Sequence, residues 1–174
     1  MLGADWRINL RWPDRGIGRD PGQVRQAAAT ICEARPRTVA IPYWSDRHPD
    51  HVAASSVLTE AVFNARLRRY EAGADPWATQ WICYYFINDS VAPSFVVDVT
   101  DHYEKKRSAL ACHRTQFAPN TGDAVSTRLT SELFQQLIAS RDAQFGAVAG
   151  VRFAEGFVVR DPIVRPHLFK HDPR

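Results

Sequence analysis

The segment Val39–His51, with the sequence VAIPYWSDRHPDH, decides how this chain is interpreted. A short apolar run is followed by a polar run, and a long helical pattern begins at its end, which predicts a strand that leads into a helix. Within the polar run, His48 and His51 are three residues apart with Asp50 between them. Open α/β sheets bind ligands outside the carboxyl ends of their strands, so these ionisable side chains lie where such a fold places its function.

The spacing of the two histidines leaves two interpretations open. Pro49 suits the first turn of a helix, which puts His48 near the cap and His51 one turn further on. Neutral imidazole is the commonest metal ligand and a carboxylate beside it can fix its tautomer, so one ring could hold a metal while the other polarises a substrate. Alternatively, both rings cap and solvate a helix start, because H-x-x-H is a weak motif and a catalytic zinc needs about three protein ligands.

Composition narrows the class of protein. The 174 residues are 45% hydrophobic and 24% charged, which is typical of one globular domain. The net charge of +3 is a mild basic excess without a basic stripe, so we expect no nucleic-acid partner. Three widely spaced cysteines without a C-x-x-C pair indicate a reducing compartment. The sequence contains no apolar run long enough to predict a membrane span. We therefore expect a cytoplasmic protein.

Periodic patterns alternate along the chain. Helical patterns cover residues 21–34, 52–69, 101–113 and 131–148, and strand-like runs cover residues 38–41, 81–86, 95–99 and 151–159. Helices that alternate with β-branched runs are typical of a layered α/β domain with a largely parallel sheet.

Several segments, in order and in register, resemble a known family. Residues 40–55, which contain AIPY, DRHPDH and AAS, resemble the second signature of the LmbE-like (PIG-L) zinc N-deacetylases. PSFVVDVT at residues 93–100, the EKK, AL and TQF runs within residues 104–117, and GVRFAE with Phe157 near the end look like the bacillithiol-biosynthesis branch. The resemblance extends from about Leu10 to Pro162 and implies a three-layer Rossmann-like domain with a mostly parallel sheet.

The resemblance also implies an activity. Such enzymes use zinc to hydrolyse the N-acetyl group of a GlcNAc-containing substrate, which is N-acetylglucosaminyl-malate in the bacillithiol branch. His51 would be a zinc ligand, His48 would polarise the acetyl carbonyl and help the amine to leave, and Asp50 would orient His48. Zinc would supply an activated water and a polarised carbonyl oxygen.

Two further residues are candidates for binding the substrate. Arg47 precedes His48 and is suited to a carboxylate such as that of malate; alternatively, it pairs with Asp46 or Asp50. His113 lies beside the TQF run, in a segment that resembles a substrate-side element of the family. The expected partner is thus a small amino-sugar molecule, and a homo-oligomer is a further expectation because family members often associate.

One departure from the family pattern affects the expected activity. The first signature of the family, a Pro/Ala-His-Pro-Asp-Asp run after the first strand, provides two zinc ligands and the carboxylate base, and no such run is found in residues 1–174. We therefore expect a single LmbE-like domain that is N-terminally incomplete, lacks the first strand and first signature loop, and is incomplete for catalysis. The alternative is a non-catalytic domain that keeps the fold and binds sugar or a partner.

Overall fold

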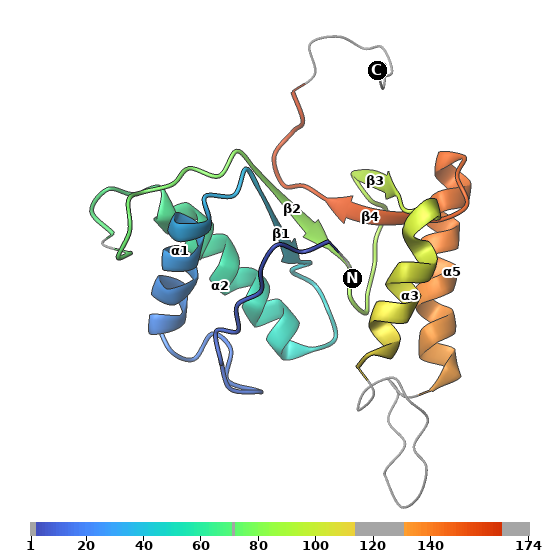
Figure 1. Cartoon of the computed structure of the whole chain (residues 1–174), viewed down its shortest axis with the longest axis horizontal. Coiled ribbons are helices and arrows are strands. Elements are labelled where there is room, and N and C mark those ends of the chain that lie inside the picture. Colours follow the sequence, from blue (N-terminus) through green and yellow to red (C-terminus); the bar gives the residue numbers. More distant parts are fainter. Residues whose placement is uncertain (1–2, 71, 114–130, 165–174) are drawn as a thin grey trace, which may run out of the picture.

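The computed structural model describes residues 3–70, 72–113 and 131–164 (Figure 1). In chain order the elements are α1 (Gly22–Ala34), β1 (Thr38–Pro42), α2 (Pro49–Ala65), β2 (Trp81–Tyr85), β3 (Phe95–Asp98), the 3-10 turn η1 (Thr100–His102), α3 (Tyr103–Ala111), α5 (Glu132–Ala149) and β4 (Ala154–Val158). None of the described helices is both long enough and apolar enough to cross a lipid bilayer.

The described strands form one sheet in the order β1-β2-β4-β3. β1 and β2 are parallel, whereas β4 is antiparallel to both of its neighbours, β2 and β3. The expected α/β class is confirmed, but the sheet is mixed rather than mostly parallel. The reason is the path of β4, which returns between β2 and β3 in the opposite direction, although β1, β2 and β3 themselves share one direction.

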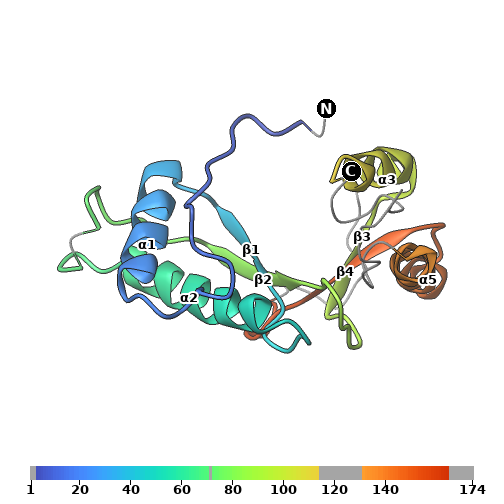
Figure 2. The same ribbon diagram turned by 90° about the horizontal axis from the view of Figure 1, so that it is seen from below.

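Helices α1 and α2 pack together beside β1 and β2, and α3 and α5 lie at the other end of the sheet (Figures 1 and 2). The contact between α1 and α2 is made of small side chains, including Ala28 and Ala61, which are fully buried. Ile41 of β1 and Tyr84 of β2 belong to the same core. Burial of a side chain such as Ile41 contributes roughly 1.5–3 kcal/mol to stability, so this core fixes the strand that precedes the histidines.

The carboxyl ends of β1 and β2 bring two loops together. Pro42 at the end of β1 is level with Tyr85 at the end of β2, and the backbone N of Tyr43 donates a hydrogen bond to the carbonyl of Tyr85 at 2.9 Å. The segment between β1 and α2 therefore lies beside the loop that follows β2, and both views show this juxtaposition (Figures 1 and 2).

A close approach of α5 to β4 fixes the other half of the fold. A Cβ atom added at Gly156 would lie 2.6 Å from Cε2 of Phe145, so only glycine lets the helix pack at this distance. Next to this contact, Nζ of Lys106 lies 2.7 Å from Asp142 Oδ2 and 2.6 Å from Glu155 Oε1. The lysine thus joins α3 to α5 and β4 through two ion pairs.

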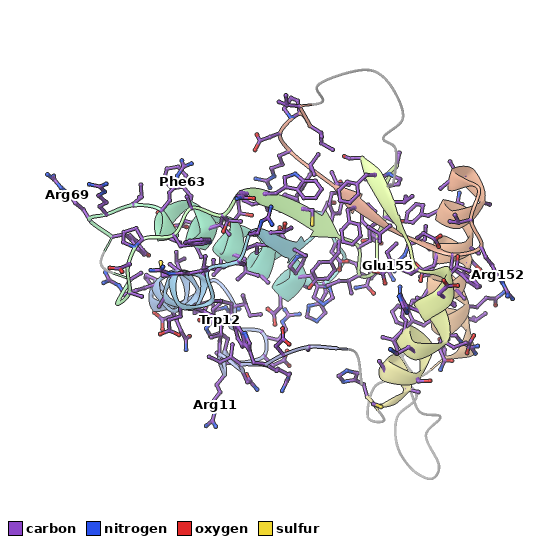
Figure 3. The ribbon with its side chains drawn as sticks, turned by 45° about the horizontal axis from the view of Figure 1, so that its top comes forward. Arg11, Trp12, Phe63, Arg69, Arg152 and Glu155 are labelled. Carbon is purple, nitrogen blue, oxygen red and sulfur yellow. The ribbon has the colours of Figure 1, made fainter. Side chains whose placement is uncertain are left out.

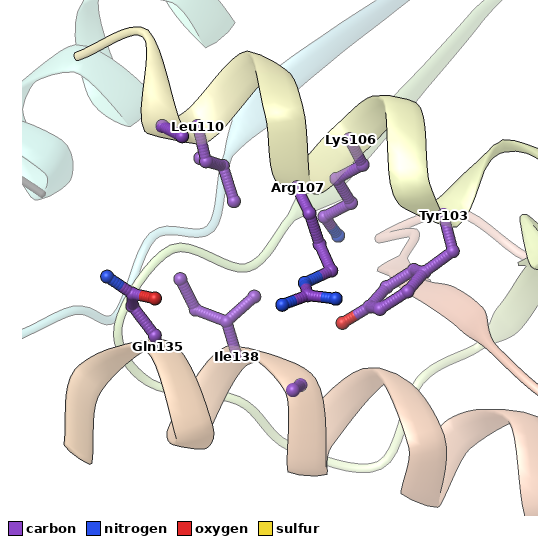
Figure 4. A pocket seen from close by; sticks show the side chains of 8 residues that line it. Tyr103, Lys106, Arg107, Leu110, Gln135 and Ile138 are labelled. Atoms are coloured by element: carbon purple, nitrogen blue, oxygen red, sulfur yellow. The ribbon is translucent and has the colours of Figure 1, made fainter. Parts of the chain in front are cut away.

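A small pocket separates α3 from α5 and has a volume of about 140 Å³ (Figure 4). Tyr103, Lys106 and Leu110 of α3 line it, facing Gln135 and Ile138 of α5. None of the described residues predicted for the functional site lines this pocket.

Several element boundaries differ from the sequence expectations. The helix expected at residues 52–69 begins at Pro49 and ends at Ala65, because His48 provides the cap and a turn follows Ala65. The helix expected at residues 101–113 begins as the 3-10 turn η1 and continues as α3. The strand expected at residues 151–159 is shorter, because a bend occupies residues 151–152.

Arginine side chains are distributed over the surface. Arg11, Arg69 and Arg152 project from separate parts of the molecule, near the N-terminus, after α2 and after α5 (Figure 3). These three side chains do not gather on one face.

Candidate functional site

The start of α2 is built by its own sequence. His48 is the N-cap residue with extended backbone angles, φ −89° and ψ 120°, and Pro49 occupies the first helical turn. Nδ1 of His48 accepts a hydrogen bond from the backbone N of Asp50 at 3.2 Å, as a capping side chain does. The helix also places His51 one turn after the cap, on the same side as His48.

The carboxylate of Asp46 is the buried centre of the site, with a side chain that is 2% exposed. Its Oδ1 accepts hydrogen bonds from the backbone N of His48 at 2.8 Å and from Nδ2 of Asn88 at 2.9 Å. Its Oδ2 accepts from the backbone N of Asn88 at 2.9 Å and of Asp89 at 3.4 Å. Burial would raise the pKa of Asp46, but the hydrogen bonds from Asn88, His48 and His51 outweigh it and lower the pKa to about 2.

The proton of His51 is located by this carboxylate. Nδ1 of His51 lies 2.9 Å from Oδ1 of Asp46, and an ionised carboxylate can only accept, so Nδ1 carries the shared proton. Nδ2 of Asn88 lies 3.4 Å from the same Nδ1, and both nitrogens donate to the one oxygen of Asp46. The neutral ring of His51 therefore keeps a lone pair on Nε2, and its side chain is 28% exposed.

The neutral ring of His48 has the opposite tautomer. Its Nδ1 accepts the Asp50 amide, so its proton is on Nε2. The two rings lie face to face, with 4.7 Å between their centroids and 30° between their planes. Among the described residues, no hydrogen bond engages Nε2 of either ring. The pair thus offers a proton donor and a lone pair side by side.

The carboxylate of Asp50 does not make the expected contact with His48. It is the backbone N of Asp50 that orients His48, while Oδ2 accepts a hydrogen bond from the backbone N of Arg15 at 2.7 Å. Arg15 has a left-handed backbone with φ 59°, which costs a non-glycine residue roughly 1–2 kcal/mol. The Asp50 carboxylate therefore holds the segment before α1 against the start of α2.

The two predicted substrate residues lie at the surface. Nε of Arg47 is 3.9 Å from Oδ1 of Asp89, and both side chains are about half exposed, at 53% and 49%. This ion pair is with Asp89, neither of the two partners expected as the alternative to substrate binding. His113 follows α3, is exposed, and donates its backbone N–H to the carbonyl of Leu110 at 3.0 Å. The substrate roles of both residues stay predictions.

The site can be tested for its fit to a metal. His51, held by a carboxylate at Nδ1 and with Nε2 open, has the arrangement of a metal-binding histidine. Within residues 3–70, 72–113 and 131–164, however, no group of three or more histidine, cysteine or acidic side chains is placed to hold a metal. A catalytic zinc needs about three such ligands, so the described residues alone do not form a complete zinc site.

Two residues of the site, Asp46 and Asn88, are not expected from sequence patterns. The sequence suggests Asp46 only as an ion-pair partner of Arg47, and Asn88 lies just after the strand-like run at residues 81–86. A signal does exist, because both residues follow strands that are adjacent and parallel, and the carboxyl ends of such strands meet at one edge.

Comparisons with known proteins place the fold. No protein-family model matches the chain. The crystal structure of the conserved protein TT1542 from Thermus thermophilus is similar over 94% of this chain and 69% of its own length, with 31% sequence identity and a TM-score of 0.82.

Two structures of lower identity share the architecture. N,N'-diacetylchitobiose deacetylase from Pyrococcus horikoshii matches 85% of this chain with a TM-score of 0.69 and 23% identity. The 4-carboxy-2-hydroxymuconate hydratase GalB from Pseudomonas putida KT2440 matches 86% with a TM-score of 0.67 and 20% identity. The chain spans 54% and 62% of their respective lengths. One is a deacetylase and the other a hydratase, so this architecture does not by itself decide the reaction. The chain belongs to the family of the conserved Thermus protein TT1542 and has the LmbE-like deacetylase fold.

Proposed function

We propose that this protein takes part in the zinc-dependent hydrolysis of the N-acetyl group of a GlcNAc-containing substrate, with N-acetylglucosaminyl-malate as the specific substrate. The observation that carries the proposal is the pair of imidazoles at the start of α2, which hold opposite tautomers beside a buried carboxylate. The likeness in fold to a deacetylase and the resemblance of the DRHPDH segment to the family signature support it. A cytoplasmic location belongs to the same proposal.

His48 has the chemistry for two steps of amide hydrolysis. Its Nε2–H can donate a hydrogen bond to the acetyl oxygen, where negative charge develops in the transition state. The same proton can then pass to the departing amine, and a positioned acid of this kind contributes on the order of 10²–10⁴-fold in rate. The helix cap fixes this ring, because its Nδ1 is held by the backbone of α2.

His51 would be the zinc ligand that these residues provide. Its Nε2 is open, and Asp46 fixes the tautomer through Nδ1. Bound zinc would supply an activated water and a polarised carbonyl. At least one further ligand would have to come from residues outside the described ranges, because the described residues contain no group of three side chains placed to hold a metal.

The position and exposure of Arg47 support the proposal that the substrate carries a carboxylate. Its guanidinium is next to His48 in the chain and 53% exposed, and its ion pair with Asp89 at 3.9 Å is weak enough to exchange for a ligand. A guanidinium binds a carboxylate with two parallel hydrogen bonds, which suits the malate group.

A second candidate is a non-catalytic domain that keeps the fold and binds sugar. The observation that favours it is that the described residues do not form a group of three metal-binding side chains. Calorimetric titration of the protein with zinc separates the two candidates, because tight binding of one equivalent contradicts the non-catalytic domain.

The proposed function is tested by incubating the protein with zinc and N-acetylglucosaminyl-malate and measuring the free amine that forms. Because the described residues alone do not form a complete zinc site, we expect amine release that needs both zinc and His48 only from a form of the protein in which that site is complete. If one equivalent of zinc is bound and the substrate stays acetylated, the proposal is wrong.

A further inference from the structure

Asn88, which belongs to no recognised sequence motif, contacts the buried carboxylate of Asp46 through both its backbone and its side chain. Its backbone N donates to Oδ2 of Asp46 and its Nδ2 donates to Oδ1, both at 2.9 Å. Asn88 therefore donates a hydrogen bond to each oxygen of the Asp46 carboxylate and helps to fix the plane of that group. The same Oδ1 accepts the proton of His51.

The loop that carries Asn88 is itself anchored from α5. Nη1 of Arg141 donates a hydrogen bond to the carbonyl of Ile87 at 2.9 Å, and the Arg141 side chain is only 12% exposed. Arg141 also lies 3.6 Å from the buried carboxylate of Asp142. The position of Asn88 is thus set by the far half of the fold.

We propose that Asn88 is a positioning residue for His51: by holding both oxygens of Asp46, it keeps Oδ1 aimed at the Nδ1–H of His51 and so leaves Nε2 open. This inference rests on the proposed function only in that an open Nε2 is what a ligand role requires.

The physical reason is rotational freedom. The terminal torsion of an aspartate side chain is broad, so a carboxylate held at one oxygen can turn away from its partner. The backbone N of His48 and of Asp89 already limit that freedom, and the side-chain amide of Asn88 adds a further donor at Oδ1, the oxygen that faces His51. Without this amide, Oδ1 keeps only the backbone N of His48 as a donor beside His51, so the ring of His51 can turn more readily and present Nε2 to Asp46, which would exchange the tautomer.

The test measures the ring nitrogens of His51 by long-range ¹H–¹⁵N correlation NMR on the labelled protein. At about pH 8.5 an ordinary imidazole is neutral, so the ¹⁵N shifts report the tautomer directly. In the unchanged protein we expect a protonated Nδ1 and an unprotonated Nε2. In Asn88→Ala, which keeps the backbone donor and removes Nδ2, we expect the two shifts to move toward each other as the Nε2–H tautomer gains population.

Asp89→Ala is the matched control, because it changes the next side chain of the same loop and leaves the backbone donors in place; its spectrum should equal that of the unchanged protein. Asn88→Leu, with a side chain of similar size and no donor, replaces Asn88→Ala if that variant does not fold. If either folded Asn88 variant keeps the original His51 shifts, the positioning role is refuted. Because zinc and substrate are absent, this result does not depend on deacetylation, and a failed amine-release assay leaves it standing.

Discussion

The buried carboxylate of Asp46 should make the stability of this protein depend on pH in acid. Hydrogen bonds lower its pKa from 3.8 to about 2 in the folded chain, against the effect of burial. A group whose folded pKa is lowered contributes stability that is complete above its unfolded pKa, near 4, and that disappears as the pH falls through about 2. The shift corresponds to roughly 2 kcal/mol, and with the side chain only 2% exposed little of it is lost to solvent screening.

Urea unfolding curves of the unchanged protein and of Asp46→Asn between pH 6 and 2 measure this contribution. The difference in the free energy of unfolding between the two proteins should be larger at pH 6 than at pH 2 by about 2 kcal/mol. Asp75→Asn serves as the control, because that side chain is 88% exposed and should add little to the profile. If the difference between the unchanged protein and Asp46→Asn is the same at both pH values, the hydrogen bonds assigned to Asp46 are refuted.

Three further changes test other parts of the structure. Gly156→Ala places a Cβ 2.6 Å from Phe145 and should lower the free energy of unfolding by about 1–3 kcal/mol in urea titrations; an unchanged midpoint would contradict the close packing of α5 on β4. Lys106→Met removes the nearer of the two cations of Asp142, whose side chain is 2% exposed, and leaves Arg141 at 3.6 Å, so it should cost about 2 kcal/mol by the same measurement; a cost within 0.5 kcal/mol, roughly that of a surface change, would count against a buried ion pair. Arg47→Ala should raise KM for a malate-bearing substrate about tenfold or more with little change in kcat, and an unchanged KM in steady-state assays would exclude carboxylate binding by Arg47.

Local patterns are sufficient to predict most of the helices and strands. Pro49 at the first turn and the apolar positions of α2 are local features, and the helix they predict is present. The place of β4 in the sheet could not be predicted, because strand pairing depends on contacts between distant segments. The run at residues 154–158 would have suited a parallel or an antiparallel neighbour equally well, and only the folded chain shows that it lies between β2 and β3.

In the candidate site, too, some features follow from local sequence and others depend on contacts between distant segments. The proximity of His48 and His51 follows from their spacing on one helix, and the structure brings the two rings together. The contact between Asp46 and Asn88 spans 42 positions in sequence and exists only because β1 and β2 are parallel neighbours. For Asp50 the sequence identifies the right residue but the wrong group. The backbone N of Asp50, and not its carboxylate, donates the hydrogen bond to His48.

The proposed chemistry depends most on two imidazoles that carry their protons on different nitrogens. Long-range ¹H–¹⁵N correlation spectra of the unchanged protein at about pH 8.5 test this directly, since an ordinary imidazole is neutral there. We predict a proton on Nε2 of His48 and on Nδ1 of His51. The same tautomer in both rings, or averaged shifts in either, would contradict the arrangement on which the hydrolytic proposal is built.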